Sequence, residues 1–200
     1  MRRSLITLLA GPVLTGLIVS NQAEIVRAQG HDDHAGAKTS QLHRPSPQEG
    51  ALVKAVRDAT EQYRDLSAAQ AAGYALQFGC VSGGDYGAMG LHFVNGGLVA
   101  DGEVDVATPE IVLYEPRPNG SARITGADYL VIAADWDAKH DTPPQLMGQL
   151  FHFFESPNRF GLPAFYTLHV WAWKDNPDGT FTNWNRAVSC DAFKPPAGVP

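Results

Sequence analysis

Three histidines and one glutamate have the side chains and positions best suited to binding a metal ion. His92 and His169 each lie in the middle of a short run of strand-forming residues, and Glu110 begins another such run. Strand side chains point alternately to the two faces, so these three could project from neighbouring strands into one interior. Two imidazoles and a carboxylate suit Zn, Fe, Mn or Cu and leave positions open for water or a substrate. We therefore predict a divalent metal site formed by His92, Glu110 and His169, with His152 as a fourth member.

The spacing of these residues leaves other interpretations open. The sequence has no His-Glu-x-x-His motif and no clustered His-x-His pair, which are local signatures of zinc proteases and cupins. His92 and His169 could instead be hydrogen-bonded core residues, or could act without a metal as general acid or base. A bound metal would serve as a Lewis acid or activate a water molecule. A hydrolase that uses the carboxylates of Glu110, Glu115 and Glu155 is a further alternative, although the sequence sets no spacing between them.

His152 lies in an aromatic segment, flanked by Phe151, Phe153 and Phe154 and bounded by prolines on both sides. This segment could line the entrance of a pocket, or it could be a strand that packs its rings on the core. His140 lies between charged residues and is expected on a solvated loop.

The first 28 residues have the pattern of a secretory signal peptide. Two arginines follow Met1, and the apolar run from Leu5 to Val19 is interrupted by two glycines and a proline. This run is shorter than the ~20 apolar residues that span a bilayer, so cleavage is favoured over an uncleaved anchor. Cleavage is expected after Ala28 or after Gly30. We predict a periplasmic or secreted protein with no stable membrane span after cleavage.

Residues 29–47 are polar and contain almost no aliphatic side chains, which predicts a disordered linker. The linker contains His31, His34 and His43, which could bind copper or zinc adventitiously. Cleavage after Gly30 would expose the amine of His31, which could chelate copper together with its imidazole. Cleavage after Ala28 would remove this arrangement.

The charge of the chain argues against polyanionic partners. Removing residues 1–28 takes away three arginines and one glutamate, which changes the formal charge from −6 to −8. Lysine and arginine are scattered without a basic run. Nucleic acid and anionic membrane surfaces are therefore excluded as partners, because both require a basic face.

The two cysteines, Cys80 and Cys190, are expected to form one disulfide in an exported protein. Two free thiols are the alternative. A bond between them would close a loop of about 110 residues, which stabilises a fold by roughly 4–5 kcal/mol in the chain-entropy model.

The domain, residues 48–195, is predicted to begin with helices. Ser46-Pro47-Gln48-Glu49 is a helix start, and apolar residues recur at spacings of three and four from Leu52 to Tyr63. A shorter helix, Ser67 to Ala72, is expected to follow a cap at Asp65 or Ser67 and to stop at Gly73.

Beyond residue 74 the pattern changes to short β-prone runs separated by glycine, proline and asparagine. The predicted strands are Ala75–Phe78, Leu91–Val94, Ile111–Tyr114, Arg123–Ile124, Tyr129–Ala133, Phe165–Trp173, Thr180–Trp184 and Val188–Cys190. Such a pattern predicts an antiparallel β barrel or sandwich, and a cupin-like barrel would satisfy it. The expected fold class is α+β, with the helical segment packed on this sheet.

The segment Tyr166–Cys190 contains three of the four tryptophans. Asn176-Pro177-Asp178-Gly179 predicts a type I turn that joins two strands into a hairpin. Trp171 and Trp173 would share a face, with Trp184 across the turn. The rings either pack in the core or form an exposed contact surface.

Three motifs lie between residues 87 and 181: GAMGLHFVN at 87–95, PEIVLYEP at 109–116 and LHVWAWKDNPDGTF at 168–181. They resemble the MGxHFVN, PExxLYEP and HVWxWxxNPxGxF motifs of a family of small exported bacterial proteins. The resemblance covers about residues 50–192 and implies the domain limits without an activity. The family has Val-Glu-Tyr in the next strand, where this chain has Ala127-Asp128-Tyr129, so the resemblance assigns no role to an acid there.

These observations predict an exported domain that binds a divalent metal or a small-molecule ligand in its β interior. The alternative is a metal-free binding or structural protein that uses the aromatic hairpin as its contact surface.

Overall fold

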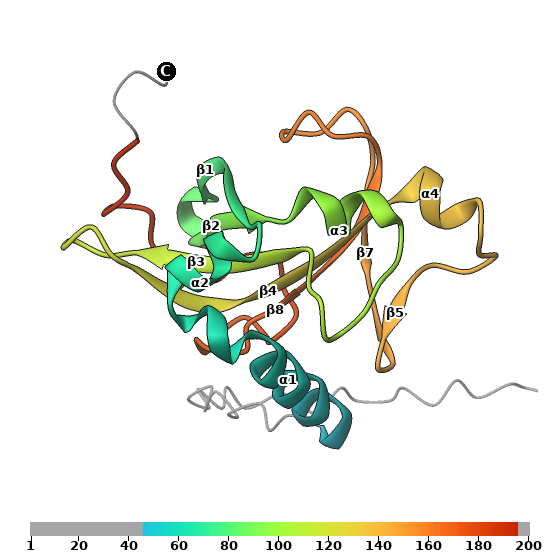
Figure 1. Ribbon diagram of the computed structural model, residues 1–200, viewed down its shortest axis with the longest axis horizontal. Coiled ribbons are helices and arrows are strands. Elements are labelled where there is room, and N and C mark those ends of the chain that lie inside the picture. Colours follow the sequence, from blue (N-terminus) through green and yellow to red (C-terminus); the bar gives the residue numbers. More distant parts are fainter. Residues whose placement is uncertain (1–45, 196–200) are drawn as a thin grey trace, which may run out of the picture. The chain divides into compact units, whose positions relative to one another are not determined.

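A computed structural model describes residues 46–195 (Figure 1). The predicted signal peptide, and the predicted linker up to residue 45, lie outside the described residues. The last residue assigned to the linker, Pro47, is already helical.

The N-terminal helices begin and end where the sequence indicates. Helix α1 (Pro47–Thr60) has a complete capping box, in which the Ser46 side chain accepts from the Glu49 N–H and the Glu49 carboxylate accepts from the Ser46 N–H. A 3₁₀ turn (Glu61–Arg64) leads into helix α2 (Leu66–Ala71), which is capped by Asp65. The chain then turns at Gly73, whose φ of 92° favours glycine. Both predicted helices are confirmed.

Replacing Ser46 by alanine should lower the free energy of unfolding by about 1 kcal/mol, because the Glu49 N–H loses its acceptor at the helix start. Equilibrium urea denaturation measures this change. Ser46→Thr is the matched control, since its hydroxyl can still accept, and it should retain most of the lost stability. Equal losses in both variants would contradict a capping role.

A curled six-stranded antiparallel sheet forms the rest of the fold, as a half-barrel with strand order β1-β2-β3-β4-β8-β7 (Figure 1). The strands are β1 (Ala75–Ser82), β2 (Ala88–Val94), β3 (Ile111–Pro116), β4 (Ala122–Ile132), β7 (His152–Phe154) and β8 (Phe165–Val170). A separate hairpin contains β5 (Gln145–Leu146) and β6 (Gln149–Leu150). The connections contain a 3₁₀ turn (Gly84–Tyr86) and the short helices α3 (Gly96–Asp101) and α4 (Ala133–Asp137). The predicted α+β class is confirmed.

The sheet buries side chains on both faces. On one face, α1 lies across β4 and β8, and Leu52 and Val56 pack against Tyr129 and Leu168 (Figure 1). Helix α2 covers the neighbouring part of the same face, where Ala69 is buried. We call this side of the sheet the helix-covered face. The opposite face buries a second apolar cluster, which includes Ala88, Ile111, Leu113, Leu130, Phe165, Trp171 and Val188. Strand residues therefore alternate between two interiors.

Strand β4 contains one residue more than β3 at the middle of their pairing. Leu113 pairs with Gly126 and Tyr114 with Ile124, so Thr125 forms a β-bulge without a partner on β3. The Thr125 carbonyl accepts instead from the backbone N–H groups of Trp173 and Lys174, at 3.0 and 3.2 Å. The bulge thereby fixes the segment that follows β8.

The prediction of two strands at residues 123–124 and 129–133 is wrong, because β4 is continuous. Gly126, Ala127 and Asp128 weaken the local strand signal, because glycine, alanine and aspartate are depleted in strands. Gly126 is nevertheless needed there, since a Cβ at this position would lie 2.1 Å from the Val170 carbonyl oxygen.

The segment after β8 is a set of turns. The Asn176–Gly179 turn is present, with the Gly179 N–H donating to the Asn176 carbonyl at 3.2 Å. The strands predicted at Thr180–Trp184 and Val188–Cys190 are absent from the described part of the chain, where only an isolated bridge joins Asn185 to Ala88. Side-chain bonds hold this segment in place of a second strand: the Asn176 amide donates to the Thr182 hydroxyl and to the Trp184 carbonyl.

Trp171 and Trp173 face different interiors, contrary to prediction, because β8 ends at Val170. Trp171 is buried in the second apolar cluster, and its indole N–H donates to the Thr182 carbonyl at 2.7 Å. Trp173 packs on the helix-covered face and donates to the Thr60 hydroxyl at 2.9 Å. Both rings therefore serve as packing rather than as a joint contact surface.

Cys80 and Cys190 form the predicted disulfide, with their Cα atoms 5.7 Å apart. Cys80 packs beside the helix-covered face and Cys190 beside the second apolar cluster. Among the described residues, no helix is long and apolar enough to cross a membrane.

Candidate metal centre

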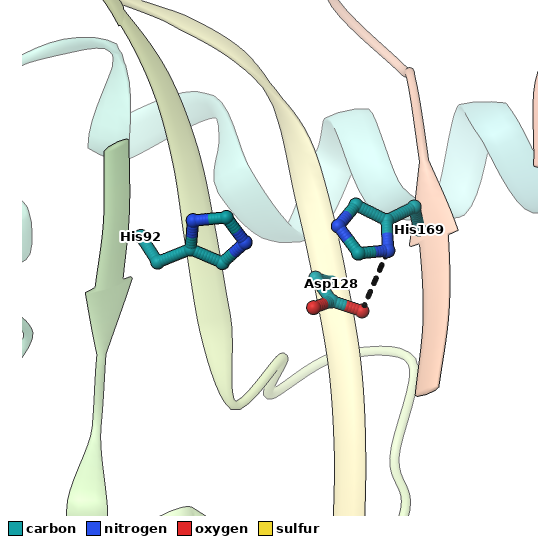
Figure 2. A group of neighbouring side chains, drawn as sticks. All are labelled: His92, Asp128 and His169. Atoms are coloured by element: carbon teal, nitrogen blue, oxygen red, sulfur yellow. Dashed lines mark ion pairs between the residues drawn. The ribbon is translucent and has the colours of Figure 1, made fainter. Parts of the chain in front are cut away.

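Three buried side chains meet on the sheet face opposite α1: His92, Asp128 and His169 (Figure 2). One potential ligand atom from each residue lies within 4.8 Å of the other two. Around a tetrahedral cation with bonds of about 2.0–2.2 Å, ligand atoms lie roughly 3.3–3.6 Å apart. Binding would therefore require each of these side chains to move inward by up to about 1 Å.

Three strands position these side chains. Asp128 on β4 pairs directly with His169 on β8, so the two side chains emerge side by side on the same face. His92 comes from β2, on the far side of β3, and the curl of the sheet brings its ring to within 5.9 Å of the His169 ring, centroid to centroid. Figure 2 shows the two imidazoles pointing toward each other with the Asp128 carboxylate between them.

The carboxylate and the rings differ in how their polar atoms are satisfied. The Thr167 hydroxyl donates a hydrogen bond to Oδ1 of Asp128. Nδ1 of His92 lies 3.2 Å from the Gly90 carbonyl. Nδ1 of His169 is 3.4 Å from Oδ1 of Asp128, but neither ring nitrogen of His169 has a partner with hydrogen-bond geometry. His169 is therefore a buried imidazole with two unsatisfied nitrogens.

Burial also sets the charge of these groups. Loss of solvation lowers the pKa of His92 to about 4, reinforced by the nearby His169, and lowers the pKa of His169 to about 3, reinforced by His152. Both rings are thus neutral at neutral pH, the form that binds a metal. Burial raises the pKa of Asp128 to about 6 in the absence of a cation. A cation at the centre would favour the charged carboxylate, since opposite charges lower such a pKa.

A cavity of about 30 Å³ lies over the three side chains. Besides the triad and Thr167, all of its lining residues are apolar, among them Met89, Ile111 and Leu130. This volume exceeds the roughly 10–15 Å³ that one water molecule needs. The centre therefore lies at the polar end of an apolar pocket.

Of the four predicted metal ligands, the structure brings His92 and His169 together and leaves Glu110 and His152 outside the group. Oε2 of Glu110 accepts from the Leu130 N–H at 3.0 Å, which continues the β3–β4 ladder past the start of β3. His152 is exposed, and its Nδ1 lies 3.0 Å from Oδ1 of Asn183. His152 nevertheless pairs with Thr167 across β7 and β8, so it flanks the same sheet face.

Asp128 is the member of the group that the sequence did not single out. It lies one residue before a predicted strand, and the glycine and bulge that precede it hide its place in β4. One signal was available: Asp128 is an acid inside an otherwise apolar run, Ala127 to Ala133, and buried acids in such runs need a partner.

Comparison with protein-family models, with curated proteins and with solved structures found no match to this chain. The resemblance to small exported bacterial proteins therefore stays a prediction.

Proposed function

We propose that this chain is a periplasmic or secreted protein that binds one divalent cation in its β interior through His92, Asp128 and His169. The observation that carries the proposal is the imidazole of His169, which is buried with both ring nitrogens unsatisfied and faces two further ligand side chains. The disulfide between Cys80 and Cys190 supports an oxidising compartment.

The energetics of burial favour a missing ligand at this place. An unsatisfied buried polar group destabilises a fold by roughly 1–3 kcal/mol, and His169 carries two such atoms. Asp128 adds a carboxyl group whose ionised form is disfavoured by burial. A divalent cation would satisfy one ring nitrogen of each histidine and neutralise the carboxylate at the same time.

The donor set narrows the identity of the cation. Two imidazole nitrogens and one carboxylate oxygen suit Zn, Fe, Mn or Cu better than Ca or Mg, which prefer oxygen ligands. Three protein ligands leave at least one coordination position open. All three side chains line the apolar cavity, so a further ligand would reach the cation from there.

The test is metal binding by the untagged mature chain in which His31, His34 and His43 are replaced by alanine, so that the linker contributes no ligands. After dialysis against Zn, Mn, Fe(II) or Cu under suitable redox conditions, elemental analysis should give close to one equivalent of a preferred metal. Asp128→Asn and His169→Leu should each lower the affinity by at least about a hundredfold.

Two features of these variants separate ligand loss from unfolding. Asp128→Asn keeps an acceptor for the Thr167 hydroxyl. His169→Leu removes two unsatisfied nitrogens, so the metal-free variant should be at least as stable as the metal-free parent. His152→Ala and Glu110→Gln are the matched controls and should retain the metal. Absence of metal from the parent, or full occupancy in the triad variants, would refute the proposal.

A further inference from the structure

We propose that the pocket above the triad admits an uncharged ligand of about two non-hydrogen atoms, of the class of dioxygen and nitric oxide, to the open position of the bound cation. This inference rests on the proposed function, because the cation supplies the bond to the ligand. The pocket determines which ligands reach the cation. Its lining restricts their polarity, its volume restricts their size, and its mouth restricts their passage.

Aromatic rings form a continuous wall on one side of the pocket. Phe78 contacts Phe160 edge-on with ring centroids 5.6 Å apart, and Phe160 contacts Phe165 at 6.2 Å. Phe165 stacks on Phe154 at 5.1 Å. All four rings line the pocket, so a ligand that approaches the triad travels along apolar surface.

The polar groups of the pocket are already engaged or would bind the cation. The Thr167 hydroxyl donates to Asp128, so it offers no free proton to a ligand. No lysine or arginine lines the pocket in the described part of the chain. Phosphates, larger carboxylates and sugars would each lose hydration here without gaining hydrogen bonds, which is unfavourable. An apolar ligand has no such loss.

The volume limits the size of the ligand. About 30 Å³ holds roughly two water-sized particles. A ligand larger than a few atoms would have to displace buried side chains such as Ile111 and Phe165, and close-packed interiors resist this. A diatomic molecule fits without such a displacement.

Phe78 marks the mouth of the pocket. It is the lining residue with a large exposed fraction, 48 %, and it belongs to a bulge between Gln77 and Cys80 of β1. Its φ of 62° is a left-handed conformation that is disfavoured by about 1–2 kcal/mol for a side chain of this size. The strained backbone holds an aromatic ring over the path to the triad, where it restricts the passage of larger molecules.

The experiment uses the full mature chain with the linker histidines replaced, loaded with Fe(II) without oxygen and titrated with nitric oxide. Electron paramagnetic resonance should reveal the signal of a high-spin iron–nitrosyl complex, with about one complex per protein molecule. Leu130→Phe places a larger ring in the pocket and should weaken nitric oxide binding at least about tenfold, with iron retained. Leu162→Phe is the matched control, because Leu162 packs against the same apolar cluster without lining the pocket.

A second variant tests the mouth and avoids the risk of overpacking. Phe78→Gly adopts the observed φ without strain and removes the ring, so nitric oxide should dissociate at least several-fold faster while iron content is unchanged. Failure to retain iron would refute the proposed metal centre. Three outcomes would overturn the inference about the ligand alone. They are retained iron without a nitrosyl signal, a nitrosyl signal abolished by an equal concentration of azide, and equal nitric oxide affinities in Leu130→Phe and Leu162→Phe.

Discussion

Replacing Cys80 and Cys190 together by alanine should lower the free energy of unfolding by about 4–5 kcal/mol. The two residues are 110 positions apart, so the bond removes a large amount of chain entropy from the unfolded state. The loss is comparable to half the stability of a typical domain, which makes it the largest expected effect of any change outside the apolar clusters. Equilibrium urea denaturation of the metal-free protein, followed by circular dichroism, measures it.

Reduction provides an independent version of the same experiment. Reductant should shift the wild-type denaturation midpoint to that of the double alanine variant and leave the variant itself unchanged. Alkylation followed by mass measurement verifies the thiol state in each sample. A wild-type midpoint that does not respond to complete reduction would contradict a stabilising role for the bond.

The contribution of Glu110 to the stability of the metal-free protein should fall as pH rises from about 5 to about 8. Burial raises the pKa of this carboxyl from 4.5 to about 8. A raised folded-state pKa means that the favourable contribution of the protonated form is fully present below pH 4.5 and is lost as pH rises through about 8. The expected loss is on the order of 4 kcal/mol. Asp128 acts in the same direction over a lower range, since its pKa is raised to about 6. His92 and His169 act in the opposite direction below about pH 6.5, because burial lowers their pKa values to about 4 and about 3.

Comparison of wild type with Glu110→Gln isolates the contribution of Glu110. Glutamine keeps an oxygen that can accept from the Leu130 N–H but cannot ionise. The unfolding free energy at pH 5 minus that at pH 8.5 should therefore be lower by several kcal/mol in Glu110→Gln than in wild type. The control is Glu155→Gln, at an exposed position, which should behave as wild type. Identical pH profiles for wild type and Glu110→Gln would show that Glu110 ionises freely in the folded protein.

Local sequence signals predicted the helices and most of the sheet. Ser46 and Glu49, which form the capping box, predict the start of α1. Pro177 and Gly179 predict the Asn176–Gly179 turn. The prediction of strands within residues 180–190 is wrong, because this strand-like segment has only one bridge partner, Ala88, in the described fold. Strand propensity alone cannot show whether a partner is present.

The candidate centre was predicted only in part, because its third member depends on pairing between distant segments. His92 and His169 stood out as polar residues in the middle of apolar strands. The position of Glu110 at the start of a strand predicts it as the carboxylate ligand, yet its Oε2 accepts from the Leu130 N–H. Asp128 faces His169 only through the β4–β8 register, which no local pattern reveals.

The bulge at Thr125 decides which interior receives the carboxylate. Ile124, before the bulge, and Ala127 and Tyr129, after it, all contribute to the helix-covered face, although their numbers differ in parity. Deleting one residue at this point would make the side chains of β4 alternate regularly between the two faces. The side chains of one half of the strand would then exchange faces. Either Ile124 would leave the helices, or Asp128 would point into the core beside α1 and Tyr129 would take its place opposite His92. A single inserted residue therefore lets one strand serve an apolar core and a polar centre at once.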